Sequence, residues 1–194
     1  MNSDSSHFHH RLTDGDDDAW TEFFDQHAAR IWRYAARFTG ADDATVADIV
    51  QEVFSAACRS IQSFDRSRGT TICWLLGITH RQAARLRRQQ LRIPVAVTSL
   101  EAFNEPATTE VAAEQQFARQ ELHETVRSVL ADLPHEMAVL LVDRYLEHLT
   151  TPELARQHNV TEQAVRSRLV RARDRFRELY EQRFGAYDDQ SSSL

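Results

Sequence analysis

Two arginine runs are the clearest chemical feature of this chain. Five arginines and no acidic residue lie between Arg81 and Arg92, and six arginines with one acidic residue, Asp174, lie between Arg166 and Arg177. Guanidinium groups bind phosphates and can donate two hydrogen bonds to a guanine base. The whole chain is acidic, with a formal net charge of −6. The two runs therefore predict localised contacts with nucleic acid rather than indiscriminate binding to polyanions.

The second arginine run falls on a predicted helix from Glu162 to about Arg183. Its apolar residues recur at helical spacing and predict one buried face: Val165, Leu169, Ala172, Phe176 and Leu179. The opposite face carries residue types that can bond or touch base edges in a major groove: Gln163, Arg166, Ser167, Val170 and Arg171. This second set is the predicted DNA-recognition surface.

The residues before that helix predict a helix-turn-helix. Thr150 and Glu153 fit a capping box, and Pro152 suits the first turn of a short helix. Asn159 and Val160 then predict a turn, and Thr161 caps the long helix. In a helix-turn-helix, the second helix enters the major groove of duplex DNA.

The first arginine run also lies on a predicted helix, which follows a polar loop at residues 65–71. One sector of this helix carries Trp74 followed by Arg81, Arg85 and Arg88. Arginines that track phosphates and an aromatic ring that stacks a base are typical of single-stranded nucleic-acid sites. The helix before the loop places Asp48, Gln51 and Glu52 largely opposite its apolar residues. With Phe54 at the border, this polar face fits either an ordinary solvated helix surface or a contact with a partner helix or groove.

The hydrophobic spacing predicts an all-α fold of two small helical domains, the C-terminal one a helix-turn-helix. Glycine and proline, at five and four residues, are too few for a sheet-rich chain. The opening helix begins near Asp16 and ends at Gly40, with aromatic and aliphatic residues on one face. We predict a domain at residues 16–93, a flexible acidic linker at 94–109 and a domain at 110–183. Such a linker would let the domains sit well apart on a common target.

Several function classes are excluded. We find no catalytic constellation and no glycine-rich phosphate loop, so we expect neither an enzyme nor a cofactor. His7, His9 and His10 lie in a polar N-terminal stretch that we expect to be flexible and not to bind metal. Cys58 and Cys73 lack CxxC spacing, which favours a reducing cytoplasm. The absence of a long apolar window and of a signal-peptide core predicts no membrane insertion.

Two sets of motifs resemble the extracytoplasmic-function (ECF) group of bacterial sigma-70 factors. The first domain carries Asp48-Ile49-Val50-Gln51-Glu52-Val53-Phe54, then Phe64-Asp65, Arg68-Gly69 and Trp74-Leu75-Leu76. The second carries Leu133-Pro134, Arg144-Tyr145, Glu153-Leu154-Ala155 and the run from Val165 to Arg173. The resemblance covers about residues 16–180, with both sets in order around a short linker.

This resemblance implies a sigma factor that binds core RNA polymerase and directs promoter-specific initiation. It implies that the clamp helices of the β′ subunit contact Asp48, Gln51, Glu52 and Phe54. It implies recognition and melting of the −10 element by Phe64, Arg66, Arg68, Thr70, Trp74, Arg81, Arg85 and Arg88. It implies recognition of the −35 duplex by Gln163, Arg166, Ser167, Val170 and Arg171. Many relatives are also held inactive by an anti-sigma factor.

Some residues depart from the family pattern. Arg81 and Arg85 stand where asparagine and aspartate are usual, which affects the expected −10 base preference, and Cys58 replaces a common tryptophan. Two alternatives therefore stay open from the sequence. One is a stand-alone helix-turn-helix regulator that binds an operator as a dimer. The other is a sigma-like decoy that holds polymerase without starting transcription.

Overall fold

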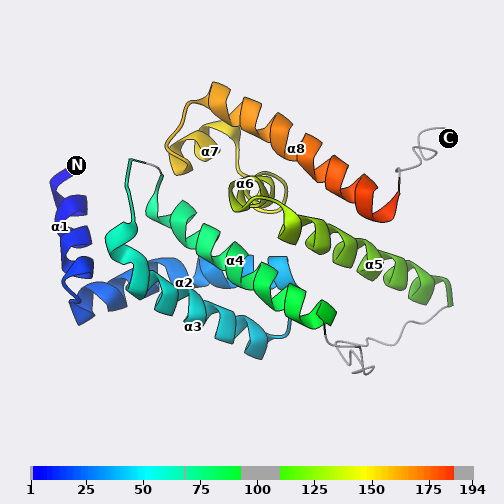
Figure 1. Ribbon diagram of the computed structural model, residues 1–194, viewed down its shortest axis with the longest axis horizontal. Coiled ribbons are helices and arrows are strands. Elements are labelled where there is room, and N and C mark those ends of the chain that lie inside the picture. Colours follow the sequence, from blue (N-terminus) through cyan, green and yellow to red (C-terminus); the bar gives the residue numbers. More distant parts are fainter. Residues whose placement is uncertain (1, 68, 93–109, 186–194) are drawn as a thin grey trace.

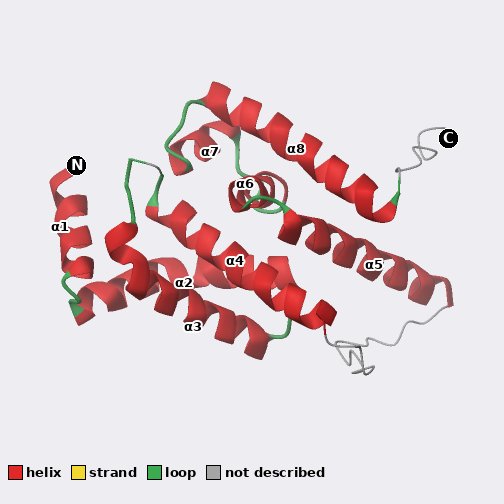
Figure 2. Ribbon diagram, in the orientation of Figure 1, coloured by secondary structure: helices red, strands yellow, loops and turns green. Residues whose placement is uncertain are grey.

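The computed structural model describes residues 2–67, 69–92 and 110–185, and every regular element among them is helical (Figures 1 and 2). This confirms the all-α prediction. The predicted linker at 94–109 lies outside the described residues, as do Arg68 and residues 186–194. The elements in chain order are α1 Asn2–Thr13, α2 Asp17–Thr39, α3 Asp43–Ser60, the 3₁₀ turn η1 Ile61–Ser63, α4 Thr71–Arg92, α5 Glu110–Asp132, α6 His135–Tyr145, α7 Thr151–Gln157 and α8 Glu162–Phe184.

A first bundle is formed by α2, α3 and α4, which pack against one another. Helix α2 begins where the Asp16 carboxylate accepts a bond from Ala19 N at 2.9 Å, and it ends at Gly40, whose φ of 63° glycine adopts without strain. Its predicted face is largely buried, including Phe23, Ile31, Tyr34 and Phe38. Phe24, expected on this face, is instead 45% exposed.

Helix α1 was not predicted, and the expectation of a flexible N-terminal stretch is wrong for the described part. Leu12 is buried, the Trp20 indole N–H donates to Leu12 O at 3.1 Å, and Arg11 pairs with Asp16 at 2.8 Å. The cause is tertiary, because a single buried leucine and two side-chain contacts hold a helix whose own sequence is mostly polar.

The second bundle, α5 to α8, contains the predicted helix-turn-helix. The capping box of Thr150 and Glu153 forms, with Thr150 N donating to Glu153 Oε2 at 2.7 Å, and Thr161 caps α8. Asn159 adopts a φ of 52° in the turn between α7 and α8. Two apolar residues of α5, Phe117 and Leu122, are 62% and 55% exposed. The N-terminal half of α5 extends beyond the helices that could cover it (Figure 1).

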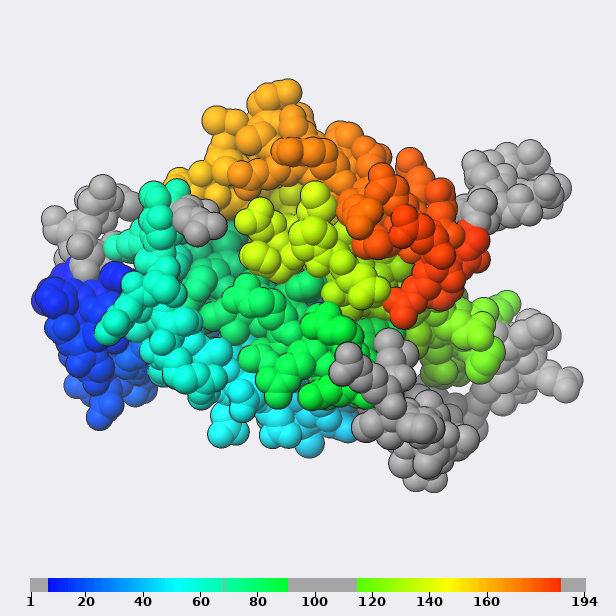
Figure 3. Space-filling view, in the orientation of Figure 1, coloured from blue at the N-terminus to red at the C-terminus, as the bar shows by residue number. Residues whose placement is uncertain are grey.

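The two bundles pack directly against each other, although the sequence had suggested that they could sit well apart. Helix α4 contacts α5 and α6, and α2 contacts α5, with no gap visible between them in the space-filling view (Figure 3). Two glycines permit the close approach. A Cβ added to Gly77 would lie 2.8 Å from the His135 ring, and one added to Gly40 would lie 2.4 Å from the Arg127 guanidinium.

One buried carboxylate, Asp143 on α6, lies at the centre of this interface. Its side chain is fully buried and is bonded from both bundles. From α2, Arg30 Nη2 donates at 3.1 Å and the Tyr34 hydroxyl also donates. From the end of α7, Gln157 Nε2 donates at 2.6 Å and His158 Nε2 lies at 3.2 Å. A buried ion is tolerated only when it is paired and hydrogen-bonded in this way.

The same carboxylate changes the pKa values of neighbouring side chains. Burial opposes a charge on His158, but hydrogen bonds to Asp143 and Cys73 outweigh it and raise the pKa of His158 to about 9. Burial and the Asp143 charge raise the pKa of the Tyr34 hydroxyl. At neutral pH a cationic Arg30, a cationic His158 and a neutral Tyr34 therefore surround the buried carboxyl group of Asp143.

A pH titration of stability tests the charge on His158. Since its pKa is about 6.5 in an unfolded chain and about 9 here, its contribution is complete below pH 6.5 and is lost as the pH rises through 9. We expect this loss to reach about 3 kcal/mol at most. Thermal unfolding is followed by circular dichroism between pH 6.5 and 9.5. Over this range the melting temperature should therefore fall more steeply for the wild type than for His158→Gln. Parallel profiles for the two proteins would show that His158 is not charged in the folded state.

Candidate nucleic-acid interface

Helix α8 presents the five residues predicted to recognise a duplex on one exposed face. Gln163, Arg166, Ser167, Val170 and Arg171 are all exposed, whereas Val165, Leu169 and Ala172 are buried on the opposite side. Val170 is 47% exposed, an apolar side chain among polar ones that could touch a thymine methyl group. Among the described residues, Arg166 pairs with Glu162 one turn earlier, at 3.0 Å, in an exposed contact that costs little to exchange for a base.

The residues expected at the −10 element gather where η1, the following loop and the start of α4 meet. Phe64 and Trp74 lie with ring centroids 5.0 Å apart, and both are half-buried. Arg81, Arg85 and Arg88 follow along α4 and are exposed. The neighbouring Arg87, which also belongs to the first arginine run, is instead engaged with Glu124 of α5 at 2.9 Å.

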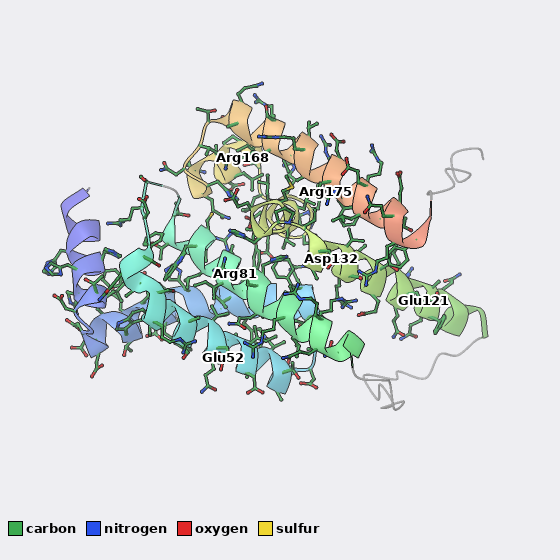
Figure 4. The ribbon with its side chains drawn as sticks, in the orientation of Figure 1. Glu52, Arg81, Glu121, Asp132, Arg168 and Arg175 are labelled. Atoms are coloured by element: carbon green, nitrogen blue, oxygen red, sulfur yellow. The ribbon has the colours of Figure 1, made fainter. Side chains whose placement is uncertain are left out.

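A cavity of about 610 Å³ lies between the two bundles at this place. Its lining joins residues from both predicted DNA surfaces: Phe64, Thr70, Trp74 and Arg81 from the first, and Arg171 from the second. His135, His158 and Arg168 of the second bundle complete much of the wall. Figure 4 shows Arg81 on α4 between Glu52 on α3 and Arg168 on α8, which lie at opposite edges of the molecule. The structure thus brings the two sets together, which the sequence did not predict.

The face of α3 expected to contact a partner is partly exposed and partly buried in the structure. Asp48, Gln51 and Glu52 are exposed, whereas Phe54 is only 8% exposed and packs 4.7 Å from the Phe24 ring. Beside them lies a shallow apolar groove of about 560 Å³, lined by Phe24, Ala28, Ala29, Trp32, Ala47, Val50, Gln51 and Phe54. Sequence analysis did not assign Phe24 or Trp32 to this surface. The sequence feature that could have identified this surface is Trp32. It is a large aromatic residue next to the core residue Ile31, but it falls outside the helical repeat of the buried residues of α2.

A second apolar groove, of about 820 Å³, lies on the second bundle between α5, α6 and α8. Its wall includes Leu122, Tyr145, Phe176 and Tyr180. No residue of this groove was assigned a binding role from the sequence, because its helices were each interpreted as packing their apolar faces inward.

The described residues contain no group of three or more His, Cys, Asp or Glu side chains that could hold a metal ion. Within the same residues, no helix is long and apolar enough to cross a bilayer. Both cysteines are free thiols; Cys58 is exposed, and Cys73 donates from Sγ to Gln157 O at 3.2 Å across the interface.

Comparison with protein-family models gives two matches. Residues 23–93 match sigma-70 region 2, and residues 123–176 match sigma-70 region 4. Together the matches cover more than half of the chain, in the order and at the positions of the two bundles.

Individual proteins are also similar. The ECF RNA polymerase sigma factor SigE of Mycolicibacterium smegmatis is 29% identical over 160 residues, which are 82% of this chain and 61% of that protein. The ECF sigma factor SigW of Bacillus subtilis is 28% identical over 169 residues, which are 84% of this chain and 89% of that protein. A solved structure of CnrH in complex with the cytosolic domain of CnrY is 23% identical, with a TM-score of 0.47, over 90% of this chain and 96% of that one.

These matches favour the sigma-factor hypothesis over the stand-alone regulator. Both sigma regions are present, in the order and at the positions of the two bundles. The chain therefore belongs to the ECF group of sigma-70 factors, non-enzymatic proteins that bind core RNA polymerase and promoter DNA and direct transcription initiation.

Proposed function

We propose that residues 16–93 form the domain that binds core polymerase and melts the −10 element. We assign residues 110–183 to the domain that recognises the −35 duplex, with 94–109 as the linker. The observation that carries this proposal is the exposed face of α8. There, five side chains able to contact base edges or a thymine methyl lie opposite a buried apolar face.

For the −35 duplex, each exposed residue type on α8 has a suitable partner. Arg166 and Arg171 can bond guanine O6 and N7, Gln163 can bond adenine, Ser167 can bond either base, and Val170 can contact a thymine methyl. Thr161 places Gln163 in the first turn of α8, and the N-terminal residues of a recognition helix are those that contact base edges.

For the −10 element, we assign the aromatic pair to the bases and the arginines to the phosphates. Extruding a base costs a few kcal/mol of stacking and pairing. Stacking on an aromatic side chain returns about 1–3 kcal/mol per base, and Phe64 and Trp74 supply such surfaces. Arg66, Arg81, Arg85 and Arg88 suit the phosphates of the same strand, and Thr70 suits a base or sugar hydrogen bond. Arg68 keeps its assignment from the family motif.

We propose that core polymerase binds the face of α3 that carries Asp48, Gln51 and Glu52. Phe54, which is 8% exposed, forms the apolar edge of this face. The adjoining groove adds Phe24 and Trp32 to this surface, because Gln51 and Phe54 line both. An apolar patch beside carboxylates is the composition expected of a surface that docks a helix.

The place of action follows from the partners. A protein that acts on core polymerase and promoter DNA works where both are found, so we propose a cytoplasmic location. Control by an anti-sigma factor stays a prediction of the family resemblance.

The recognition face of α8 is tested by alanine substitution. Arg166→Ala and Arg171→Ala should each weaken promoter recognition by the free energy of one base contact, about 1–3 kcal/mol, and so lower the amount of transcript. The assay is run-off transcription from a promoter selected with the wild type out of a library randomised upstream of the start. Arg183→Ala is the matched control, because Arg183 lies in the last turn of α8 and pairs with Asp132 at 2.8 Å.

Core polymerase binding should be unchanged in all three variants. Unchanged promoter use in Arg166→Ala and Arg171→Ala would show that the recognition face is wrongly assigned.

The α3 face is tested by Asp48→Ala. Alanine favours the helix, so a defect would come from the lost contact and not from lost folding. We expect the Kd for sigma-free core polymerase to rise about tenfold or more, as for a central interface residue. Fluorescence anisotropy of labelled protein measures it, and Glu121→Ala, an exposed acid on α5, is the control. Equal affinity of Asp48→Ala and wild type would remove α3 from the polymerase interface.

A further inference from the structure

Helix α1 lies against the surface assigned to the −10 strand, although it stands outside the family match, which begins at residue 23. It packs on α2 and on η1, and Figure 1 shows it beside η1 and the loop that follows. Leu12 is buried in the hydrophobic core, and Phe8 packs against the same core. Arg11 donates two hydrogen bonds to the Asp16 carboxylate, at 2.8 and 3.1 Å. These contacts give α1 one defined position on the first domain.

His9 of α1 contacts an aromatic residue of the −10 surface. Its ring is edge-on to the Phe64 ring, with centroids 5.8 Å apart and ring planes at 65°. The Phe64 ring lies in turn 5.0 Å from the Trp74 ring. Edge-to-face pairs at such distances attract each other beyond the effect of the area that they bury. Helix α1, the residue after η1 and helix α4 thus contribute one ring each to a continuous row.

His9 contacts Phe64 from the side away from the cavity between the bundles. Phe64 and Trp74 both line that cavity, whereas His9 is not among the described residues of its wall. Phe64 follows η1 directly, and its backbone N–H donates to Ile61 O at 3.1 Å. This bond fixes the backbone, but the side-chain torsion angles of Phe64 depend on the rings beside it. His9 therefore limits how far the Phe64 ring can turn away from a base bound on its other side.

At this position His9 is an uncharged aromatic ring. Burial, together with the nearby Arg66 and His10, lowers the pKa of His9 below its ordinary value of 6.5. The ring is therefore neutral at pH 7 and offers no positive charge to a phosphate group. Its contribution to strand binding comes from packing, whereas the neighbouring Arg66 is suited to a phosphate.

We propose that α1 is a further part of the −10 site, in which His9 is a positioning residue that holds the Phe64 ring for stacking with an unpaired base. This inference rests on the proposed −10 surface. Helix α1 packs on α2 and η1, which both belong to the first domain, so it stays beside Phe64 wherever the second domain is placed. The family match alone would not assign this helix to the site, because it begins after α1.

Binding of a single strand to holoenzyme, reconstituted from core polymerase and each variant, tests the role of His9. The probe is a labelled single-stranded oligonucleotide with the −10 motif of the promoter selected with the wild type, and fluorescence anisotropy gives its Kd. His9→Ala should raise this Kd about three- to tenfold, which corresponds to the loss of one aromatic pair. His9→Phe restores a ring at the same place and should bind the strand as tightly as the wild type.

His10→Ala is the matched control on the same helix. His10 is exposed and pairs with Asp14 at 3.1 Å, so its removal should leave the Kd for the strand unchanged. Alanine has a higher helix propensity than histidine, and neither alanine variant should therefore unwind α1. Equal Kd values for His9→Ala and the wild type, or the same loss in His9→Phe as in His9→Ala, would overturn the positioning role.

Phe64→Ala separates this inference from the −10 assignment. This variant should raise the Kd about fivefold or more, because stacking on the Phe64 ring is lost. A loss of affinity in Phe64→Ala without any loss in His9→Ala would overturn the inference and leave the −10 surface in place. No loss in either variant would show that the −10 surface is wrongly assigned, and the inference would fail with it.

Fluorine NMR of the free full-length protein follows the row of rings without DNA. The chain contains three tryptophans, so labelling with 5-fluorotryptophan gives one resonance for each, and Trp74→Phe identifies the resonance of Trp74. His9→Ala should shift this resonance, because the Phe64 ring moves against Trp74, whereas His10→Ala should not. An unshifted Trp74 resonance in His9→Ala would show that His9 does not hold the Phe64 ring.

Discussion

The arrangement of the two domains depends on one carboxylate that has no contact with water. Asp143 sits fully buried on α6, and an isolated charge there would be far too costly to keep. Its bonds to Arg30, Tyr34, Gln157 and His158 make the site tolerable only when α2 and α7 are both in place. This polar geometry therefore constrains the position of the second bundle on the first, in addition to the apolar core that the two bundles share.

The surfaces with proposed roles are arranged around this contact. On the recognition face of α8, Gln163, Arg166, Ser167 and Val170 are exposed, and Arg171 also lines the cavity between the two bundles. Asp48, Gln51 and Glu52 on α3 are exposed as well. The −10 surface is the one that the contact covers, through Thr70, Trp74 and Arg81.

The sequence predicted those features that depend on neighbours along the chain. The helix start near Asp16, the glycine end at Gly40, the capping box at Thr150 and the turn at Asn159 all formed, because each is decided within a few residues. The buried face of α8 followed from helical spacing in the same way. The recognition face is its geometric complement, so that face too could be located from sequence, although its DNA contacts stay predictions.

The domain contact could not be predicted in this way. Asp143 and Tyr34 are far apart in sequence, and nothing near either one indicates the other. Asp143 directly follows the apolar run Ala138–Val142, but an acidic residue in that position is usually exposed, so nothing in the sequence indicated its burial. Helix α1 escaped prediction for a similar reason, since Leu12 is buried by tertiary contacts that its own polar segment does not indicate. Phe117 is an exposed apolar residue on α5, and helical spacing alone does not show whether another element covers such a residue.

The central claim is that this chain gives core polymerase its promoter specificity through two separate DNA surfaces. The most direct measurement is transcription by sigma-free core polymerase, with and without the wild-type protein, on a template library randomised upstream of a fixed reporter, followed by sequencing of the transcribed templates. We expect transcription to depend on the protein and the selected templates to share two short motifs at a constant spacing. Transcripts that do not require the protein, or templates enriched in no motif, would contradict the account.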